Sequence, residues 1–229
     1  MKSLTAHSFF QLKDYIASSL FDQITYVWEA LENIESFLQK QNLGKIECEI
    51  PDGVFLKDIE KISIGKGTVV EPGAYIQGPC FIGENCQIRQ GAYIRGNVVT
   101  GNNCVIGHCS EIKNSIFLNK AQAPHFADVG DSILGNNTNL GAGTVCSNLK
   151  LTKSEVIVHF QGEKISTKRR KFGAILGDGA QTGCNTVLNP GTILFCGSCT
   201  YPNTTVGGVV PENHIVKSAS KSRIIPMKR

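Results

Sequence analysis

The chain has 229 residues, a formal net charge of +4, few aromatic side chains and 24 glycines. A charge this mild does not indicate a nucleic-acid-binding protein, and no apolar run reaches the roughly 20 residues that a membrane-spanning helix needs. The length predicts one domain with an appendage. We therefore expect neither nucleic acid nor a membrane as a partner.

The first predicted element is a helical segment at residues 1–45, with helix over residues 8–41. Apolar residues recur there at three- and four-residue intervals, beginning with Phe9 and Leu12. A break near Ser18 would give two helices instead of one. The apolar stripe needs a partner, either the side of the following domain or the same segment of another subunit. Because Asp14 interrupts the apolar part, we expect no signal peptide.

A six-residue repeat defines the second domain, residues 46–210. Through most of it an aliphatic residue returns at every sixth position, glycine often follows directly, and a small residue comes four positions later. The aliphatic positions include Ile64, Val70, Ile76, Ile82, Ile88, Ile94, Ile106, Ile112, Leu118, Leu134, Leu140, Leu176, Leu188, Leu194 and Val206. Such periodicity predicts a mainly β fold, a parallel β-helix with one short strand per hexad and three hexads per triangular coil.

The nine cysteines fit this repeat. Cys80, Cys86 and Cys104 stand at its small-residue position, which predicts packing rather than disulfides or metal ligation. Cys196 and Cys199 form a single CxxC pair, so we predict no zinc site. Reduced thiols indicate a cytoplasmic protein.

The repeat is interrupted twice and ends in a basic tail at residues 211–229. Residues 124–131 (PHFADVGD) predict a loop expelled from one coil. Residues 149–173 alternate like a β-hairpin around Gln161-Gly162. Segments inserted on one face of a solenoid commonly form its binding surface, so function is expected at these two places.

His125 in the first interruption is the candidate general base, because imidazole accepts a proton near neutral pH. The alternative is an ordinary surface histidine. Arg95 and Lys113 lie eighteen residues apart, which is one full coil, so the spacing predicts that both project from one face and bind a phosphate. The alternative is that they are two unrelated surface cations. The basic cluster Lys164, Lys168, Arg169, Arg170 and Lys171 predicts either a clamp for coenzyme A phosphates or a solvated hairpin face.

The segments EIKNSIFLNKAQAPHFADVGDSILGNNTNLGAGTVCSNL (111–149) and GEKISTKRRKFGAILGDGAQTGCNTVLNPG (162–191) carry a family resemblance. They resemble the acetyltransferase domain of the bifunctional N-acetylglucosamine-1-phosphate uridyltransferase/glucosamine-1-phosphate acetyltransferase, and its archaeal sugar-1-phosphate nucleotidyltransferase homologues. The resemblance covers residues 64–210 and implies a left-handed β-helix in a homotrimer, with active sites between subunits.

The resemblance also implies residue roles. His125 falls on the catalytic base and Glu111 on a supporting glutamate. The residues that match sugar-phosphate and sugar contacts are Arg95, Lys113, Asn139 and Asp128, the last replacing a tyrosine. Asn148 matches an asparagine at the thioester. The coenzyme contacts fall on Ala142, on Cys184 in place of a serine and on Pro202 in place of an alanine, and Lys168, Arg169 and Arg170 are the candidate phosphate clamp.

We therefore expect an acetyl-CoA-dependent N-acetyltransferase acting on an amino-sugar 1-phosphate, with glucosamine 1-phosphate as first candidate and UDP-N-acetylglucosamine biosynthesis as its pathway. No metal is required for this chemistry. The residues before the hexads lack a nucleotide loop resembling LAAGxGTRM, so we expect no uridyltransferase activity. The alternatives are a different, nucleotide-linked amino sugar as acceptor, or a non-catalytic trimeric scaffold that partners a separate nucleotidyltransferase.

Overall fold

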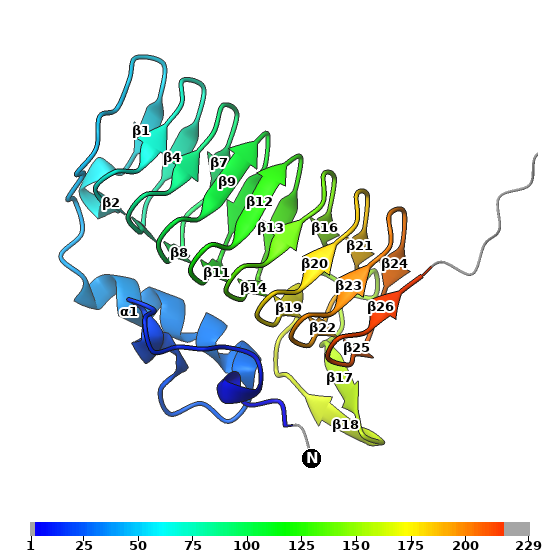
Figure 1. Cartoon of the computed structure of the whole chain (residues 1–229). Helices are drawn as coiled ribbons and strands as arrows, with labels where there is room; N and C mark the ends of the chain where they lie inside the picture. The colour runs from blue at the N-terminus through cyan, green and yellow to red at the C-terminus, as the bar shows by residue number, and fades with distance from the viewer. Residues whose placement is uncertain (1–2, 218–229) are drawn as a thin grey trace, which may run out of the picture.

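The computed structural model describes residues 3–217, which form a parallel β-helix with a helical segment along one side (Figure 1). Each coil contributes one short strand to each of three sheets, which we call sheets I, II and III in the order in which the chain visits them. Every pairing within these sheets is parallel. The mainly β fold predicted from the hexads is confirmed.

The strands of each sheet follow one another along the solenoid. Sheet I consists of β1 (Phe55–Lys57), β4 (Tyr75–Gln77), β7 (Tyr93–Ile94), β10 (Glu111–Lys113), β13 (Asp128–Gly130), β16 (Val145–Cys146), β21 (Val187–Leu188) and β24 (Thr205–Val206). Sheet II consists of β2 (Ile62–Ile64), β5 (Cys80–Ile82), β8 (Val98–Thr100), β11 (Ser115–Phe117), β14 (Ile133–Leu134), β19 (Ala174–Leu176), β22 (Thr192–Leu194) and β25 (Val209–Val210). Sheet III consists of β3 (Val69–Val70), β6 (Gln87–Ile88), β9 (Val105–His108), β12 (Gln122–His125), β15 (Asn139–Leu140), β20 (Gln181–Thr182), β23 (Cys199–Thr200) and β26 (Ile215–Val216).

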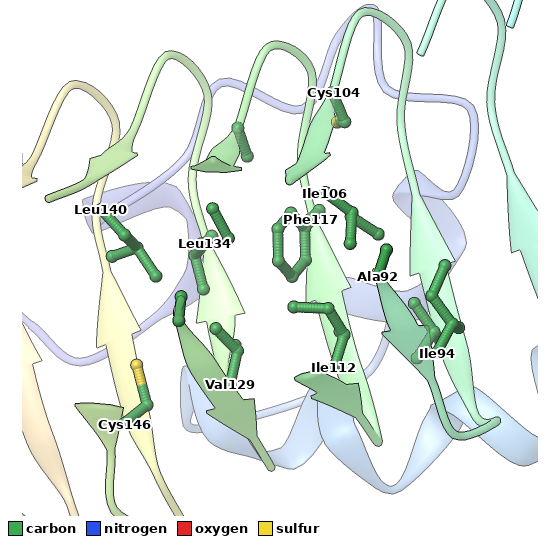
Figure 2. Packing of buried hydrophobic residues seen from close by; sticks show 14 of the residues in the cluster. Ala92, Ile94, Cys104, Ile106, Ile112, Phe117, Val129, Leu134, Leu140 and Cys146 are labelled. Atoms are coloured by element: carbon green, nitrogen blue, oxygen red, sulfur yellow. The ribbon is translucent and has the colours of Figure 1, made fainter. Parts of the chain in front are cut away.

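The interior of the β-helix is a stack of the predicted aliphatic residues, with small side chains such as Ala92 and Cys104 between them (Figure 2). Burial raises the pKa of the Cys80 thiol to about 12, as expected of a packing residue. All nine cysteines are free thiols.

One predicted interior position is wrong. After Ile112 the next inward residue is Phe117, which pairs with Thr100 and Leu134, whereas Leu118 faces outward. The corner at Asn114 is one residue shorter than the preceding corner, and the left-handed backbone of Asn114 (φ 47°) permits this tight turn. The corner at Asp131 (φ 49°) repeats it, so the hexad phase advances twice.

The same phase change explains residues 124–131, which are not an expelled loop. Pro124 and His125 belong to β12, and Asp128 to Gly130 form β13, both paired on either side with neighbouring coils. The segment breaks the six-residue pattern only because the preceding corner lacks one residue.

Residues 149–173 leave the solenoid between β16 and β19. They contain the predicted antiparallel hairpin, β17 (Ile157–Phe160) and β18 (Glu163–Ser166), which turns at Gln161 and Gly162. Toward the C-terminus the coils continue past residue 210, because β26 pairs with β23. The remainder of the predicted basic tail, residues 218–229, lies outside the described residues.

The N-terminal segment is not one long helix, and the predicted helix over residues 8–41 is wrong. It consists of three 3₁₀ turns, Ala6–Ser8, Ser18–Phe21 and Val27–Leu31, followed by α1 (Asn33–Lys40), and a fourth 3₁₀ turn, Ile59–Lys61, lies before β2. Amides of the solenoid take up carbonyl groups that a helix would use: Asp178 N donates to Phe9 O at 2.9 Å, and Asn136 Nδ2 donates to Gln11 O at 3.0 Å.

This segment covers the outer face of sheet II. The side of the β-helix was one of the two partners expected for its apolar residues. Outward residues of that sheet, such as Ile133 and Ile175, form a second hydrophobic core with Trp28 and with Phe9, whose ring stacks on Phe195 at 4.4 Å. Sheet II is therefore buried on both faces.

We expect Phe117→Ala to lower the free energy of unfolding by about 3–5 kcal/mol, because it opens a cavity in the stack. Phe55→Ala should change it by less than about 0.5 kcal/mol, since the Phe55 side chain is 61% exposed. Urea denaturation of both variants measures the difference. Equal losses in the two variants would contradict the inward position of Phe117.

Candidate active site

Two rows of charged and aromatic residues run along the outer face of sheet I. The register places Tyr93, Glu111 and Asp128 side by side on β7, β10 and β13. Two residues further along the same strands, Arg95 lies opposite Lys113. The prediction from their spacing that these two cations share a face is confirmed.

The charges of these rows are coupled. Arg95 Nη1 lies 2.5 Å from Glu111 Oε1, and its guanidinium lies 5.7 Å from the centre of the Tyr93 ring. Partial burial and the neighbouring Glu111 carboxylate raise the pKa of Asp128, against the opposing effect of Arg95. Adjacent carboxylates beside a cation give this face the means to bind an ammonium and a phosphate group together.

His125 ends β12 at the corner between sheets III and I, where its side chain is exposed. It pairs with His108 of the preceding coil. The chain then turns through Phe126 and enters β13 at Asp128, so His125 lies at the edge of the face that holds the carboxylates. His125 and Asp128 thus come from a regular corner and not from a flexible insertion.

The predicted coenzyme residues succeed His125 along the same corner. His125 O accepts a hydrogen bond from Gly143 N at 3.1 Å, Ala142 O one from Asn185 N at 2.7 Å, and Cys184 O one from Asn203 N at 2.8 Å. His125, Ala142, Cys184 and Pro202 therefore occupy equivalent positions in consecutive coils. We call these four residues the corner row. Its members from Cys184 onward are exposed.

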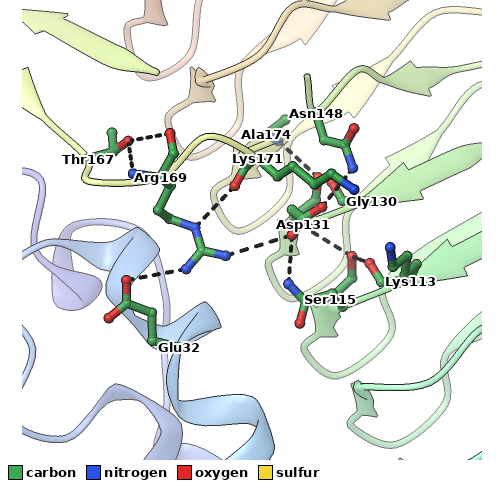
Figure 3. A network of polar contacts seen from close by, with 12 residues as sticks. Glu32, Lys113, Ser115, Gly130, Asp131, Asn148, Thr167, Arg169, Lys171 and Ala174 are labelled. Atoms are coloured by element: carbon green, nitrogen blue, oxygen red, sulfur yellow. Dashed lines mark hydrogen bonds and ion pairs between the residues drawn. The ribbon is translucent and has the colours of Figure 1, made fainter. Parts of the chain in front are cut away.

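Asn139 and Asn148 lie apart from the corner row. Asn139 is on β15 in sheet III, where it pairs with Gln122 and Gln181. Asn148 follows β16 at the opposite edge of sheet I, where its Nδ2 donates to Asp131 Oδ2 at 2.7 Å (Figure 3). A single chain therefore brings His125, Glu111, Asp128, Arg95 and Lys113 to one face, with Asn148 at the far end of its strands.

Within one chain, Lys168, Arg169 and Arg170 do not form the predicted phosphate clamp beside the coenzyme residues. The Arg169 side chain is only 13% exposed and lies between two carboxylates. Its Nη2 is 3.7 Å from Asp131 Oδ1, and its Nη1 is 3.4 Å from Glu32 Oε1. It links the inserted segment to the solenoid and to the N-terminal segment (Figure 3). Lys168 and Arg170 are exposed beside it, away from the corner row. Asp131 is a residue that sequence reasoning missed, although the equal spacing of Asn114, Asp131 and Asn148 was a usable signal.

Comparison with known proteins matches residues 76–216 to the family described as the GMPPB C-terminal domain. The chain belongs to this family. A protein of Sulfurisphaera tokodaii named bifunctional sugar-1-phosphate nucleotidylyltransferase/acetyltransferase is 34% identical over 173 residues, 76% of this chain and 42% of the relative. The bifunctional protein GlmU of Methanococcus maripaludis is 32% identical over 206 residues, 90% of this chain and 48% of the relative.

A third relative is closer in length to this chain than the first two are. The putative uncharacterized acetyltransferase YaiX of Escherichia coli is 31% identical over 177 residues, 77% of this chain and 74% of the relative. The chain spans less than half the length of the first two relatives. The family resemblance carried by residues 111–149 and 162–191 is confirmed.

No helix within residues 3–217 is both long and apolar enough to cross a membrane. No group of three or more His, Cys, Asp or Glu side chains in that range could hold a metal ion.

The pKa of Asp128 tests the charge coupling on sheet I. We expect Glu111→Gln to lower this pKa, because a like charge is removed, and Arg95→Met to raise it, because an attracting cation is lost. Carboxyl-carbon NMR titration of Asp128 measures both shifts. A pKa that does not fall in Glu111→Gln would show that the two carboxylates are not neighbours in solution.

Proposed function

We propose that this protein is an acetyltransferase that moves the acetyl group of acetyl-CoA to the amine of an amino-sugar 1-phosphate, with glucosamine 1-phosphate as the first acceptor to test. The observation that carries the proposal is the placement of His125 at the edge of a face bearing Glu111, Asp128, Arg95 and Lys113. The names of the relatives from Sulfurisphaera tokodaii and Escherichia coli, both containing the word acetyltransferase, support it.

In the proposed reaction His125 takes a proton from the acceptor amine as the nitrogen attacks the thioester carbonyl. The new bond is between nitrogen and the acetyl carbon, and the carbon–sulfur bond breaks. The thiolate of coenzyme A leaves and takes up the proton. No acyl-enzyme is formed, so Cys184 acts as a coenzyme contact and not as a nucleophile.

The proposed roles of the other residues follow from their charge and place. Lys113 and Arg95 hold the phosphate, since ammonium and guanidinium groups suit a dianion. Glu111 orients Arg95 and supports the charge that develops on His125. Asp128 accepts hydrogen bonds from the sugar. The pantetheine arm of acetyl-CoA lies along the corner row, past Ala142 and Cys184.

We also propose that the protein works as a homotrimer in the cytoplasm. The candidate site is an open face of one chain, and a second copy placed against it would close the site and exclude water. The exposed basic residues Lys168 and Arg170, far from the corner row of their own chain, could then reach the coenzyme of a neighbour. The free thiols support a reducing compartment.

A second acceptor class is favoured by one observation. Asp128 places a second carboxylate beside Glu111, and partial burial together with that neighbouring carboxylate raises the pKa of Asp128. A second carboxylate at this point suits an acceptor with additional hydrogen-bond donors. A nucleotide-linked amino sugar is the candidate of this kind, and it would leave the role of His125 unchanged.

Mass spectrometry of mixtures of acetyl-CoA and glucosamine 1-phosphate tests the reaction. We expect an N-acetylated product, and we expect His125→Ala to lower the rate by on the order of 100-fold or more, because general base catalysis is lost. His159→Ala on the exposed side of β17 is the matched control and should keep the native rate. Product only with a nucleotide-linked acceptor would select the second class, whereas an active His125→Ala variant would contradict the proposed base.

A further inference from the structure

Three aromatic residues form a row on the outer face of sheet I, in the coils that precede the candidate site. Phe55 on β1 pairs with Tyr75 on β4, and Tyr75 pairs with Tyr93 on β7. The rings of Tyr75 and Tyr93 meet edge to face, with their centres 5.4 Å apart. The three strands lie side by side at the N-terminal end of the solenoid (Figure 1). We call Phe55, Tyr75 and Tyr93 the aromatic row.

The aromatic row is open to solvent at both of its ends. Phe55 is 61% exposed and Tyr93 is 39% exposed. By contrast Phe81, an outward aromatic residue of sheet II in the same part of the solenoid, packs against the N-terminal segment, where its ring lies 6.3 Å from that of Phe37. Only 7% of the chain is aromatic, so three such residues in consecutive coils on an uncovered face indicate a binding surface.

A second row on the same face carries positive charges. Lys57 pairs with Gln77, and the register continues this row with Arg95 and Lys113 in the two coils that follow. Lys57 and Arg95 are exposed, and the Arg95 guanidinium lies 5.7 Å from the centre of the Tyr93 ring. The core of a protein–protein interface is depleted of charge, whereas a phosphate group requires cations. The face therefore suits a ligand that combines a flat ring with phosphate groups.

Both rows run into the candidate site. The aromatic row continues with Glu111 and Asp128 on the next two strands of sheet I. Strands of successive coils lie about 4.8 Å apart, so Tyr75 stands two strands, or ~10 Å, from Glu111. In a nucleotide-linked sugar a diphosphate and a ribose lie between the sugar and the base, and together they span a distance of this order. A sugar held beside the carboxylates therefore brings its base to the aromatic row.

We propose that the aromatic row binds the nucleoside of a nucleoside diphosphate-linked amino sugar, and that such a compound is the acceptor of the acetyl group. The inference rests on the proposed function and selects the second of its two acceptor classes. The base lies on Phe55 and Tyr75, since aromatic side chains stack on nucleic-acid bases. The diphosphate lies along Lys57, Arg95 and Lys113. The amino sugar keeps the place proposed for it beside the two carboxylates.

Acetyl transfer to two acceptors tests the inference. Glucosamine 1-phosphate and UDP-glucosamine carry the same amino sugar and the same first phosphate, and differ only in the nucleotide part. We expect the native protein to have a higher kcat/KM for UDP-glucosamine, by on the order of tenfold or more, because stacking of the base adds to binding. Uridine is a sufficient probe, since stacking on aromatic side chains tolerates any base.

Two variants of the aromatic row separate the two acceptors. Phe55→Ala and Tyr75→Ala should each lower kcat/KM for UDP-glucosamine on the order of tenfold, mainly through KM. Both should leave kcat/KM for glucosamine 1-phosphate within about twofold of the native value. Val69→Ala is the matched control, because Val69 lies on β3 in sheet III, just before β4, and is 58% exposed. It should leave kcat/KM for both acceptors within about twofold.

Equal use of the two acceptors by the native protein, or equal losses for both acceptors in Tyr75→Ala, would overturn the inference and leave the proposed function standing. Sedimentation of Phe55→Ala distinguishes a ligand surface from a contact between copies of the chain. An unchanged oligomeric state supports the ligand surface. Dissociation of the variant would assign the aromatic row to a subunit contact and overturn the inference.

Transfer to neither acceptor would contradict the proposed function, and calorimetry with UDP then decides whether the aromatic row binds a nucleotide. Binding of UDP to the native protein that is lost in Phe55→Ala and Tyr75→Ala, but kept in Val69→Ala, supports the nucleoside site. A native protein that does not bind UDP, or that binds it equally in all three variants, contradicts that site.

Discussion

The rest of the structure depends on the fixed parallel register of the stacked coils. Strands of successive coils lie about 4.8 Å apart, so residues one coil apart in sequence become neighbours along each sheet and each corner. This brings Arg95 beside Lys113, Glu111 beside Asp128, and His125 into line with Ala142. The aliphatic stack inside the coils maintains the register, because a slip of one residue would expose every inward side chain.

Two faces of the β-helix, those of sheets II and I, differ in what covers them. Sheet II is covered by the N-terminal segment, and the hairpin of the insertion packs into the same second core through Val156 and Val158. Sheet I is left open, with charged side chains along it and the corner row at one edge. The insertion leaves at the other edge, where Asp131 and Arg169 join it to the solenoid. Covering one sheet in this way stabilises the scaffold while leaving the proposed catalytic face accessible.

Most of the fold could be predicted from the hexads, because the period and the inward aliphatic residues are visible in the sequence. The shortened corners could not be predicted. The corner before Phe117 lacks one residue, and the resulting shift of the six-residue pattern makes residues 124–131 look like a loop in the sequence. The N-terminal segment has helical periodicity, but its carbonyl groups bind solenoid amides such as that of Asp178. Such distant partners leave no local signal.

The candidate site was predictable to a different degree for each residue. The eighteen-residue spacing placed Arg95 and Lys113 on one face, and the family resemblance supplied Ala142, Cys184 and Pro202, which the register then aligned with His125. The ion pairs of Arg169 with Glu32 and Asp131 were not predictable, because both partners are remote from it in sequence. The structure of the protein with coenzyme A bound tests the central claim most directly. The account predicts the thiol beside His125 and the pantetheine arm along Ala142 and Cys184, and coenzyme A bound away from the corner row would contradict it.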